Sequence, residues 1–374
     1  MKVLLINAVL GYGSTGKIVL DIAREYDEKG FEVKIAYGRK PEIPAGAEKY
    51  AVLIGSKADT YMHGIYTRLT DKHGLGSRHA TAKFLKWAEE YNPDILWLHN
   101  IHGYYINYEM LFAWIKSRPD MKVKWTLHDC WTFTGHCAYY TYEKCDKWMT
   151  CCSECPSLAQ YPKSNRDNSK DNYLRKKAAF TGVKNLQIIT PSAWLKAEVE
   201  KSFLAEYPVE VIYNRINTEV FKPTDSSFRK DHDLADKKML LGVASIWERR
   251  KGLDDYIELS RILDAKAPGR YKIVLVGLNE AQIDDLHKRG IDILALPRTS
   301  SATKLAEIYS AADAFVNLTH EDNLPTVNLE AEACGTPVIT YDTGGCAETI
   351  HRQDSVVVPQ DIQAVSKIIT DVIY

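Results

Sequence analysis

The chain has 374 residues, with 48 Lys and Arg against 49 Asp and Glu, and 45% of its residues are hydrophobic. This length favours two domains, and the composition excludes disordered and fibrous proteins. The near-neutral charge argues against a surface built for nucleic acid, so no nucleic-acid partner is expected. No apolar run reaches the roughly 20 residues that cross a membrane.

The first residues, Met1 to Ala8, could pass for a short signal peptide, but their apolar stretch is brief and a glycine loop follows it. We therefore expect a buried first strand and a cytoplasmic protein.

Apolar, β-rich runs alternate with helical patterns, which is typical of parallel sheets covered by helices on both faces. We expect strands at Lys2–Ala8, Glu32–Tyr37, Ile95–His99, Val123–Leu127, Leu186–Thr190, Val209–Tyr213, Lys238–Val243, Tyr271–Val276, Ile291–Leu296, Ala314–Leu318 and Pro337–Tyr341. The polar stretch Asn217–Lys237 separates the two sets. The pattern predicts Rossmann-like domains at 1–217 and 218–360 and a terminal helix at 361–374. Ligands of such sheets bind at the carboxyl ends of the strands.

The stretch that begins at Glu321 is the most informative part of the second domain. Pro325 suits the first turn of a helix and Gly335 its end, so a strand through Asn323 and Leu324 is expected to run into a short helix. The amide groups at the start of such a helix bind anions, here a diphosphate.

Two acidic residues flank this helix start. Glu330, about one turn into the helix, would accept hydrogen bonds from ribose hydroxyls, and Asp322 would lie nearer the reacting centre. The alternative is an ordinary helix cap and a solvated acid.

A cluster of cations follows the strand that ends near Ser245. Arg250 and Lys251, followed by Gly252, could neutralise a diphosphate leaving group as charge builds on it. The alternative is a solvated turn.

These residues resemble the retaining glycosyltransferases of family 4, and most closely their capsule, colanic-acid and exopolysaccharide branch. The family's Glu-x7-Glu element corresponds to Asp322 and Glu330, and its basic element to Arg250-Lys251-Gly252. Its interdomain signature corresponds to the run from Val211 to Asn217 with Phe221 and Pro223. Because Glu321 precedes Asp322, either carboxylate could be the working acid, and Ser245 stands where many relatives carry arginine.

The resemblance implies the GT-B fold, in which two Rossmann-like domains face a central cleft. It implies a nucleotide-sugar donor, UDP- or GDP-linked, bound by the second domain. The residues implied in donor binding are Gly13, Arg298, Asn323, Leu324 and Glu330, and those implied in catalysis are His128, Arg250, Lys251 and Asp322. The leaving diphosphate would itself take the acceptor proton, so no catalytic metal or other cofactor is expected.

The glycine loop of the first domain, Gly11 to Lys17, nearly spells a P-loop. Ile18 stands where the Mg²⁺-binding hydroxyl would be, which weakens a nucleotide-triphosphate function. The glycines still permit close approach of a ligand.

Histidines follow two further strands of the first domain. His99 and His102 come after one strand, and His128 and Asp129 after the next. The resemblance assigns His128 to the donor sugar. His102 is expected on the acceptor side or as a residue that organises the loop, and Tyr104 is expected on the acceptor side. A lone histidine at such a position would more often be structural.

Six of the eight cysteines lie in the loop 130–156. Cys137, Cys145, Cys152 and Cys155 suggest a structural zinc site that ends in Cys-x-x-Cys, with His136 as a substitute ligand. Reduced core thiols and disulfides are the alternatives.

Basic residues between Lys163 and Lys184 outnumber acidic ones. Such a flank suits a polyprenyl-diphosphate-linked acceptor and peripheral contact with the inner membrane, although a solvated helix explains it equally well. The predicted activity is transfer of a hexose to a glycan or lipid-linked acceptor in bacterial polysaccharide synthesis. The alternatives are a sugar-nucleotide epimerase with this fold, a P-loop-like nucleotide-binding protein and a zinc-stabilised binding module.

Overall fold

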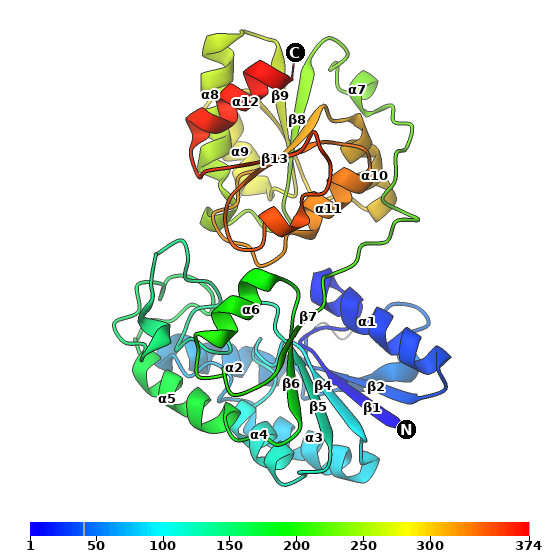
Figure 1. Ribbon diagram of the computed structural model, residues 1–374, viewed down its shortest axis with the longest axis vertical. Coiled ribbons are helices and arrows are strands. Elements are labelled where there is room, and N and C mark those ends of the chain that lie inside the picture. Colours follow the sequence, from blue (N-terminus) through cyan, green and yellow to red (C-terminus); the bar gives the residue numbers. More distant parts are fainter. Residues whose placement is uncertain (40–41, 374) are drawn as a thin grey trace. The chain divides into compact units, whose positions relative to one another are not determined.

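The structure is a computed structural model that describes residues 1–39 and 42–373. The chain divides into two compact units, Met1–Tyr213 and Asn214–Tyr374 (Figure 1). The predicted passage 217–237 lies at the start of the second unit, where it contains a short helix, α7 (Phe228–Asp231).

The first unit is built on a parallel sheet of seven strands in the order β3-β2-β1-β4-β5-β6-β7. Its strands are β1 (Lys2–Ile6), β2 (Glu32–Tyr37), β3 (Ala51–Leu53), β4 (Ile95–Leu98), β5 (Lys122–Thr126), β6 (Leu186–Thr190) and β7 (Val209–Val211). Its helices are α1 (Gly13–Glu28), α2 (Lys57–Thr70), α3 (Arg78–Tyr91), α4 (Tyr108–Lys116), α5 (Ser169–Phe180) and α6 (Ala193–Glu200).

The second unit is built on a parallel sheet of six strands in the order β10-β9-β8-β11-β12-β13. Its strands are β8 (Lys238–Val243), β9 (Tyr271–Val276), β10 (Ile293–Leu296), β11 (Ala314–Asn317), β12 (Val338–Tyr341) and β13 (Val356–Val358). Besides α7, its helices are α8 (Leu253–Lys266), α9 (Glu280–Lys288), α10 (Ala302–Ala311), α11 (Thr326–Ala333) and α12 (Ile362–Val372). The predicted fold of two Rossmann-like sheets is confirmed.

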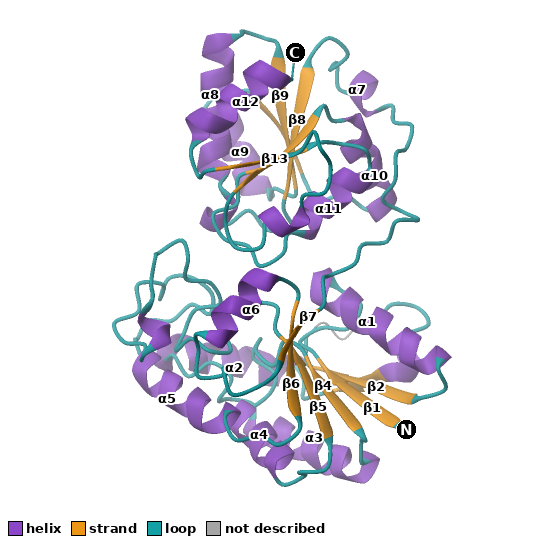
Figure 2. Ribbon diagram, viewed as in Figure 1, coloured by secondary structure: helices purple, strands orange, loops and turns teal. Residues whose placement is uncertain are grey.

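Both faces of each sheet are apolar, as the continuous runs in the sequence predict. In β1, Leu4 and Ile6 enter one core cluster, while Val3 and Leu5 enter another on the opposite face. Adjacent residues of a strand point to opposite faces, so a strand without polar alternation must be covered twice. Figure 2 shows helices on both sides of each sheet.

The strand prediction fails in two respects. β11 ends at Asn317, so the strand expected through Asn323 and Leu324 is absent. The chain turns there instead, because the Thr319 hydroxyl donates to the carbonyls of Arg250 and Glu321 at 3.2 and 3.0 Å. Strands β3 and β13 were not predicted, since three residues are too few to show a periodicity.

The predicted terminal helix is confirmed as α12, which packs on α8 with Val365 and Ile369 buried. Lys266 of α8 donates to the Ser366 hydroxyl at 2.9 Å. None of the helices in the described part of the chain is both long enough and apolar enough to pass through a bilayer.

Candidate functional site

In the second unit, the loops that follow β8 and β11 meet through an ion pair. Lys251 Nζ lies 2.5 Å from Asp322 Oδ2, and both side chains are largely shielded from solvent. Arg250 donates to the Glu321 carbonyl at 3.1 Å, and the His320 amide donates to the Arg250 carbonyl at 2.7 Å. The two loops are neighbours because β8 and β11 pair directly. The predicted basic and acidic elements are therefore joined in one structure.

Of the two acids that the sequence left open, Asp322 is the one whose carboxylate meets Lys251. Burial by itself would raise the pKa of Asp322, but the charges of Lys251 and Arg250 outweigh it and hold this pKa below its ordinary value. The carboxylate is therefore ionised, and it holds the Lys251 side chain in place.

Two glycines permit this close packing of loops. Gly252 has a φ of +74°, and a Cβ there would come within 2.1 Å of the Leu318 carbonyl oxygen. Gly344 has a φ of +54°, and its Cβ would lie 1.8 Å from the carbonyl oxygen of Asp322. Because both backbones are left-handed and both contacts are with backbone atoms, larger residues would force the loops apart.

Helix α11 carries the other predicted acid. Glu330 Oε2 accepts a hydrogen bond from the buried Tyr309 hydroxyl at 3.1 Å. The helix is attached to the sheet by buried amides, since Asn317 of β11 donates to Asn328 at 2.8 Å and Asn328 donates to Thr349 at 2.9 Å. These contacts fix the start of α11 beside the Lys251–Asp322 pair.

The other residues predicted to bind the donor differ in their exposure to solvent. Asn323 and Leu324 are buried in the loop that leads into α11. Arg298 is exposed in the loop after β10, the strand at the edge of the sheet.

In the first unit, the loops after β4 and β5 bring the predicted histidines together. His99 Nδ1 and His128 Nε2 are 3.0 Å apart, so one ring donates a hydrogen bond and the other accepts it. His102 Nε2 lies 3.0 Å from Asp129 Oδ2, and its Nδ1 is 3.0 Å from the Tyr161 hydroxyl.

Burial sets the charge of this cluster. It lowers the pKa of His128 to about 4, and it also holds the pKa of His99 well below the usual range. Burial would raise the pKa of Asp129, but the neighbouring His102 reverses the effect and the carboxyl stays below its ordinary value. At neutral pH the rings of His99 and His128 are therefore neutral, and the Asp129 carboxylate near them is ionised.

The structure adds buried partners that the sequence did not single out. His73 packs against Tyr104 with the rings tilted by 60° and their centres 4.8 Å apart, and its Nε2 accepts from the Gly103 amide at 3.3 Å. Lys176 lies under the Trp131 ring and donates to the Trp131 carbonyl at 2.5 Å. Neither His73 nor Lys176 follows a strand, so strand ends, the signal that identified His102 and His128, could not identify them.

Tyr104, predicted on the acceptor side, has a φ of +71°. A tyrosine in this region costs about 1–3 kcal/mol, and such residues gather at functional sites. The ring is held by its contacts with His73 and His63.

The glycine loop leads directly into α1, which begins at Gly13. Gly11 has a φ of +71°, and a Cβ there would clash with Pro44, so its role is local packing. Gly13 also has a positive φ, but a Cβ there would meet no atom within 4 Å. Open space above Gly13 is what the predicted ligand loop requires.

The predicted zinc cysteines lie near one another but form no ready metal centre. The thiol of Cys137 hydrogen-bonds to Cys155, which lowers the pKa of Cys155 to about 7, and the Gly135 amide donates to Cys152 Sγ at 3.1 Å. His136 is buried, and its Nδ1 pairs with Asp71. Among residues 1–39 and 42–373, no three His, Cys, Asp or Glu side chains are arranged to hold a metal ion. The zinc site stays a prediction.

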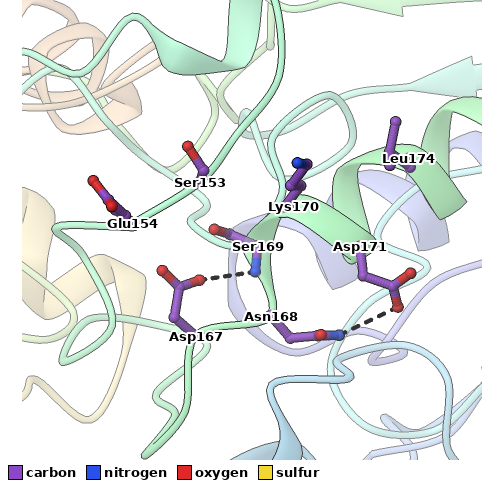
Figure 3. A pocket seen from close by; sticks show the side chains of 8 residues that line it. All are labelled: Ser153, Glu154, Asp167, Asn168, Ser169, Lys170, Asp171 and Leu174. Carbon is purple, nitrogen blue, oxygen red and sulfur yellow. Dashed lines mark hydrogen bonds between the residues drawn. The ribbon is translucent and has the colours of Figure 1, made fainter.

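A cavity of about 380 Å³ opens at the start of α5 (Figure 3). Three carboxylates line it, those of Glu154, Asp167 and Asp171, against the single cation Lys170, so its net negative charge would repel a nucleoside diphosphate. None of the predicted site residues lies in its wall.

Two family models match the chain. The model described as Glycosyltransferase Family 4 matches residues 15–220, and the model described as Glycosyl transferases group 1 matches residues 225–374. Both describe transferases, which favours sugar transfer over the epimerase and P-loop alternatives.

Relatives and solved structures agree with these matches. A putative colanic acid biosynthesis glycosyl transferase, WcaC of Escherichia coli K12, is 22% identical over 96% of this chain and 88% of its own length. The fold resembles sucrose-phosphate synthase from Thermosynechococcus elongatus, with a TM-score of 0.69, 16% identity and coverage of 100% of this chain and 89% of that one. It also resembles Anabaena HepE in complex with UDP, with a TM-score of 0.63 and 17% identity. That match covers 100% of this chain and 90% of the HepE chain.

The family 4 model alone spans more than half of the 374 residues. The chain therefore belongs to the family 4 glycosyltransferases and is a glycosyltransferase with the GT-B fold.

Proposed function

We propose that this enzyme transfers a hexose from a UDP- or GDP-linked donor to a lipid-linked glycan at the cytoplasmic face of a bacterial membrane, with retention of anomeric configuration. The observation that carries the donor assignment is the Lys251–Asp322 pair, with Arg250 beside it and α11 next to it. The WcaC relative, by its description, supports a surface polysaccharide as the product.

In this proposal the diphosphate binds at Lys251 and Arg250. As the bond between the sugar carbon and the leaving oxygen breaks, negative charge grows on the diphosphate, and two fixed cations stabilise it most at that point. Asp322 is a positioning residue, because its ionised carboxylate holds Lys251 in place before the donor binds. Glu330 accepts the ribose hydroxyls.

The first unit contributes neutral imidazoles in this proposal. A neutral His128 can donate a hydrogen bond to a sugar hydroxyl without repelling the positive charge that develops on the sugar ring. The acceptor oxygen bonds to the sugar carbon while its proton passes to the leaving diphosphate, so atoms balance without a protein base.

The deciding measurement is a thermal-shift series with UDP, GDP, ADP and Mg²⁺-ATP. A ligand that binds only the folded protein raises its unfolding temperature by mass action. We expect UDP or GDP to stabilise the protein without added metal, and the more effective of the two names the donor class. Stabilisation by Mg²⁺-ATP alone would contradict the proposal and return the glycine loop to consideration as a P-loop.

A further inference from the structure

Helix α2 (Lys57–Thr70) buries polar side chains and exposes apolar ones, the reverse of the usual amphipathic helix. Its buried face carries His63 and Thr67. Its outer face carries large apolar side chains whose exposed fractions are high: Tyr61 70%, Met62 61%, Ile65 38%, Tyr66 37% and Leu69 55%. A helix in water normally buries its apolar stripe, so this exposed stripe needs a partner.

Hydrogen bonds of His63 prevent α2 from rotating to bury the stripe. His63 Nδ1 lies 2.9 Å from the Ser77 hydroxyl. Its Nε2 accepts from the amides of Gly74 and Gly76, each at 3.2 Å. Burial also lowers the pKa of His63 to about 4, so the ring stays a neutral acceptor. The hydrogen bonds of His63 therefore hold α2 with its apolar face toward solvent.

Cations lie beside the C-terminal end of the stripe. The amide of Asn165 donates to the Arg68 carbonyl at 2.8 Å, and Arg68 Nε donates to the Asn165 side chain at 2.9 Å. These bonds dock the loop 163–166 against the last turn of α2, and its Lys163 and Arg166 are exposed.

Cations also lie at the N-terminal end. Arg39, Lys57 and Tyr61 line a cavity of about 390 Å³, and both cationic side chains are exposed. The nearby acids are Glu42, which lines the same cavity, and Asp59, which is bonded to Ser56 in the helix cap. At the other end, Asp167 accepts from the amides of Cys155 and Ser169.

We propose that the outer face of α2, with the cations at its two ends, docks on an anionic lipid bilayer. This inference rests on the proposed function, in which the acceptor is lipid-linked. It names the surface of the enzyme that would bind the membrane carrying that acceptor. A helix of 14 residues with an apolar face and flanking cations lies in the plane of the headgroups, with the apolar side chains among the acyl chains.

Charge argues for lipid over a second copy of the chain. A two-fold contact through α2 would bring the same cationic ends together, whereas lipid phosphates would pair with them.

The test is co-sedimentation of the full chain with vesicles of phosphatidylcholine alone or mixed with phosphatidylglycerol. The test variant replaces Tyr61, Met62 and Leu69 by Gln. The matched control replaces Met149, Leu174 and Val372 by Gln, three apolar residues that are also exposed, at 43%, 50% and 62%. Gln is a good helix former and all six positions face solvent, so both proteins should fold.

We expect the wild type and the control to bind the anionic vesicles, and the test variant to bind about tenfold or more weakly, because lost apolar burial weakens interfacial binding. Lys163→Glu with Arg166→Glu should weaken binding by roughly fivefold per charge at low salt.

Three results would overturn the docking surface: no binding of the wild type to anionic vesicles, equal binding of the test variant, or a solution dimer that only the test variant abolishes while vesicle binding is unchanged. Stabilisation by UDP or GDP, measured on the same proteins, separates this proposal from the proposed function. Vesicle binding without any nucleotide effect would leave the surface standing and remove the donor assignment.

Discussion

The two units share the order of their first six strands but place different chemistry at equivalent loops. In the second unit, the loop after the first strand, β8, supplies Arg250 and Lys251, and the loop after β11 supplies Asp322. In the first unit, the loop after β1 supplies glycines, and the loop after β4 supplies His99, whose ring meets that of His128. One unit is thus equipped with fixed charge and the other with buried neutral rings. The difference suggests that the diphosphate and the sugars are recognised by separate means.

The largest effect is expected when one of the charged side chains of the second unit is removed. Lys251→Ala should lower kcat/KM by about two to three orders of magnitude, the usual loss when a group that stabilises transition-state charge is removed. Steady-state transfer assays measure it. Because the variant leaves Asp322 shielded and unpaired, Lys251→Ala combined with Asp322→Asn restores the fold without restoring the rate.

The matched control for that prediction is Lys272→Ala. Lys272 also pairs with a carboxylate, that of Asp292, but the pair lies near the opposite end of the strands. Its rate should equal that of the wild type. A similar loss in both variants would mean that the effect at Lys251 is structural.

The next effect concerns the neutral rings and their response to acid. The pKa of His63 and that of His128 are each lowered by burial to about 4, whereas an unfolded histidine titrates near 6.5. Between these values the unfolded chain binds more protons, so stability falls as pH falls through this window, by about 1.4 kcal/mol per pKa unit for each group at most.

Tryptophan fluorescence can follow this loss in the first unit, because seven of the eight tryptophans precede Asn214. We expect its unfolding temperature to drop by several degrees between about pH 7 and pH 5. An unfolding temperature that is constant or rises on acidification would contradict the buried, neutral state of these histidines.

A smaller difference between the two units is expected from the predicted zinc site in the loop 130–156 of the first unit. If Cys137, Cys145, Cys152 and Cys155 bind zinc, purified protein should contain about one zinc per chain. A chelator should then lower the unfolding temperature of the first unit but not that of the second. Elemental analysis decides the point, and metal-free protein with an unchanged melting curve would leave the cysteines as reduced core thiols.

The smallest effect is expected in the second unit, at His320. Its hydrogen bond with Asp255, at 3.1 Å, raises its pKa. A raised pKa contributes stability that is fully present below the ordinary value of about 6.5 and is lost as pH rises through the folded value. His320→Gln should therefore cost at most about 1 kcal/mol near pH 5 and less near pH 8, the opposite trend to the first unit. Chemical unfolding at both pH values measures it.

Much of the fold could be predicted from the sequence because strand identity is a local property. The apolar runs at Glu32–Tyr37, Lys238–Val243 and Tyr271–Val276 match β2, β8 and β9 residue for residue. The expected strand through Asn323 and Leu324 was wrong because side-chain and backbone bonds of a neighbouring loop, through Thr319, turn the chain there. Such bonds are invisible in a linear pattern.

The sequence alone therefore determined which residues stand at strand ends, since that follows from periodicity and from turn-forming residues. Only the tertiary structure decided which strand ends are neighbours, and with this that Lys251 meets Asp322 and His99 meets His128. The tertiary structure also decided that the apolar side of α2 faces solvent. That outcome depends on the hydrogen bonds of His63 with the segment from Gly74 to Ser77, and the helical pattern of α2 by itself predicts the reverse.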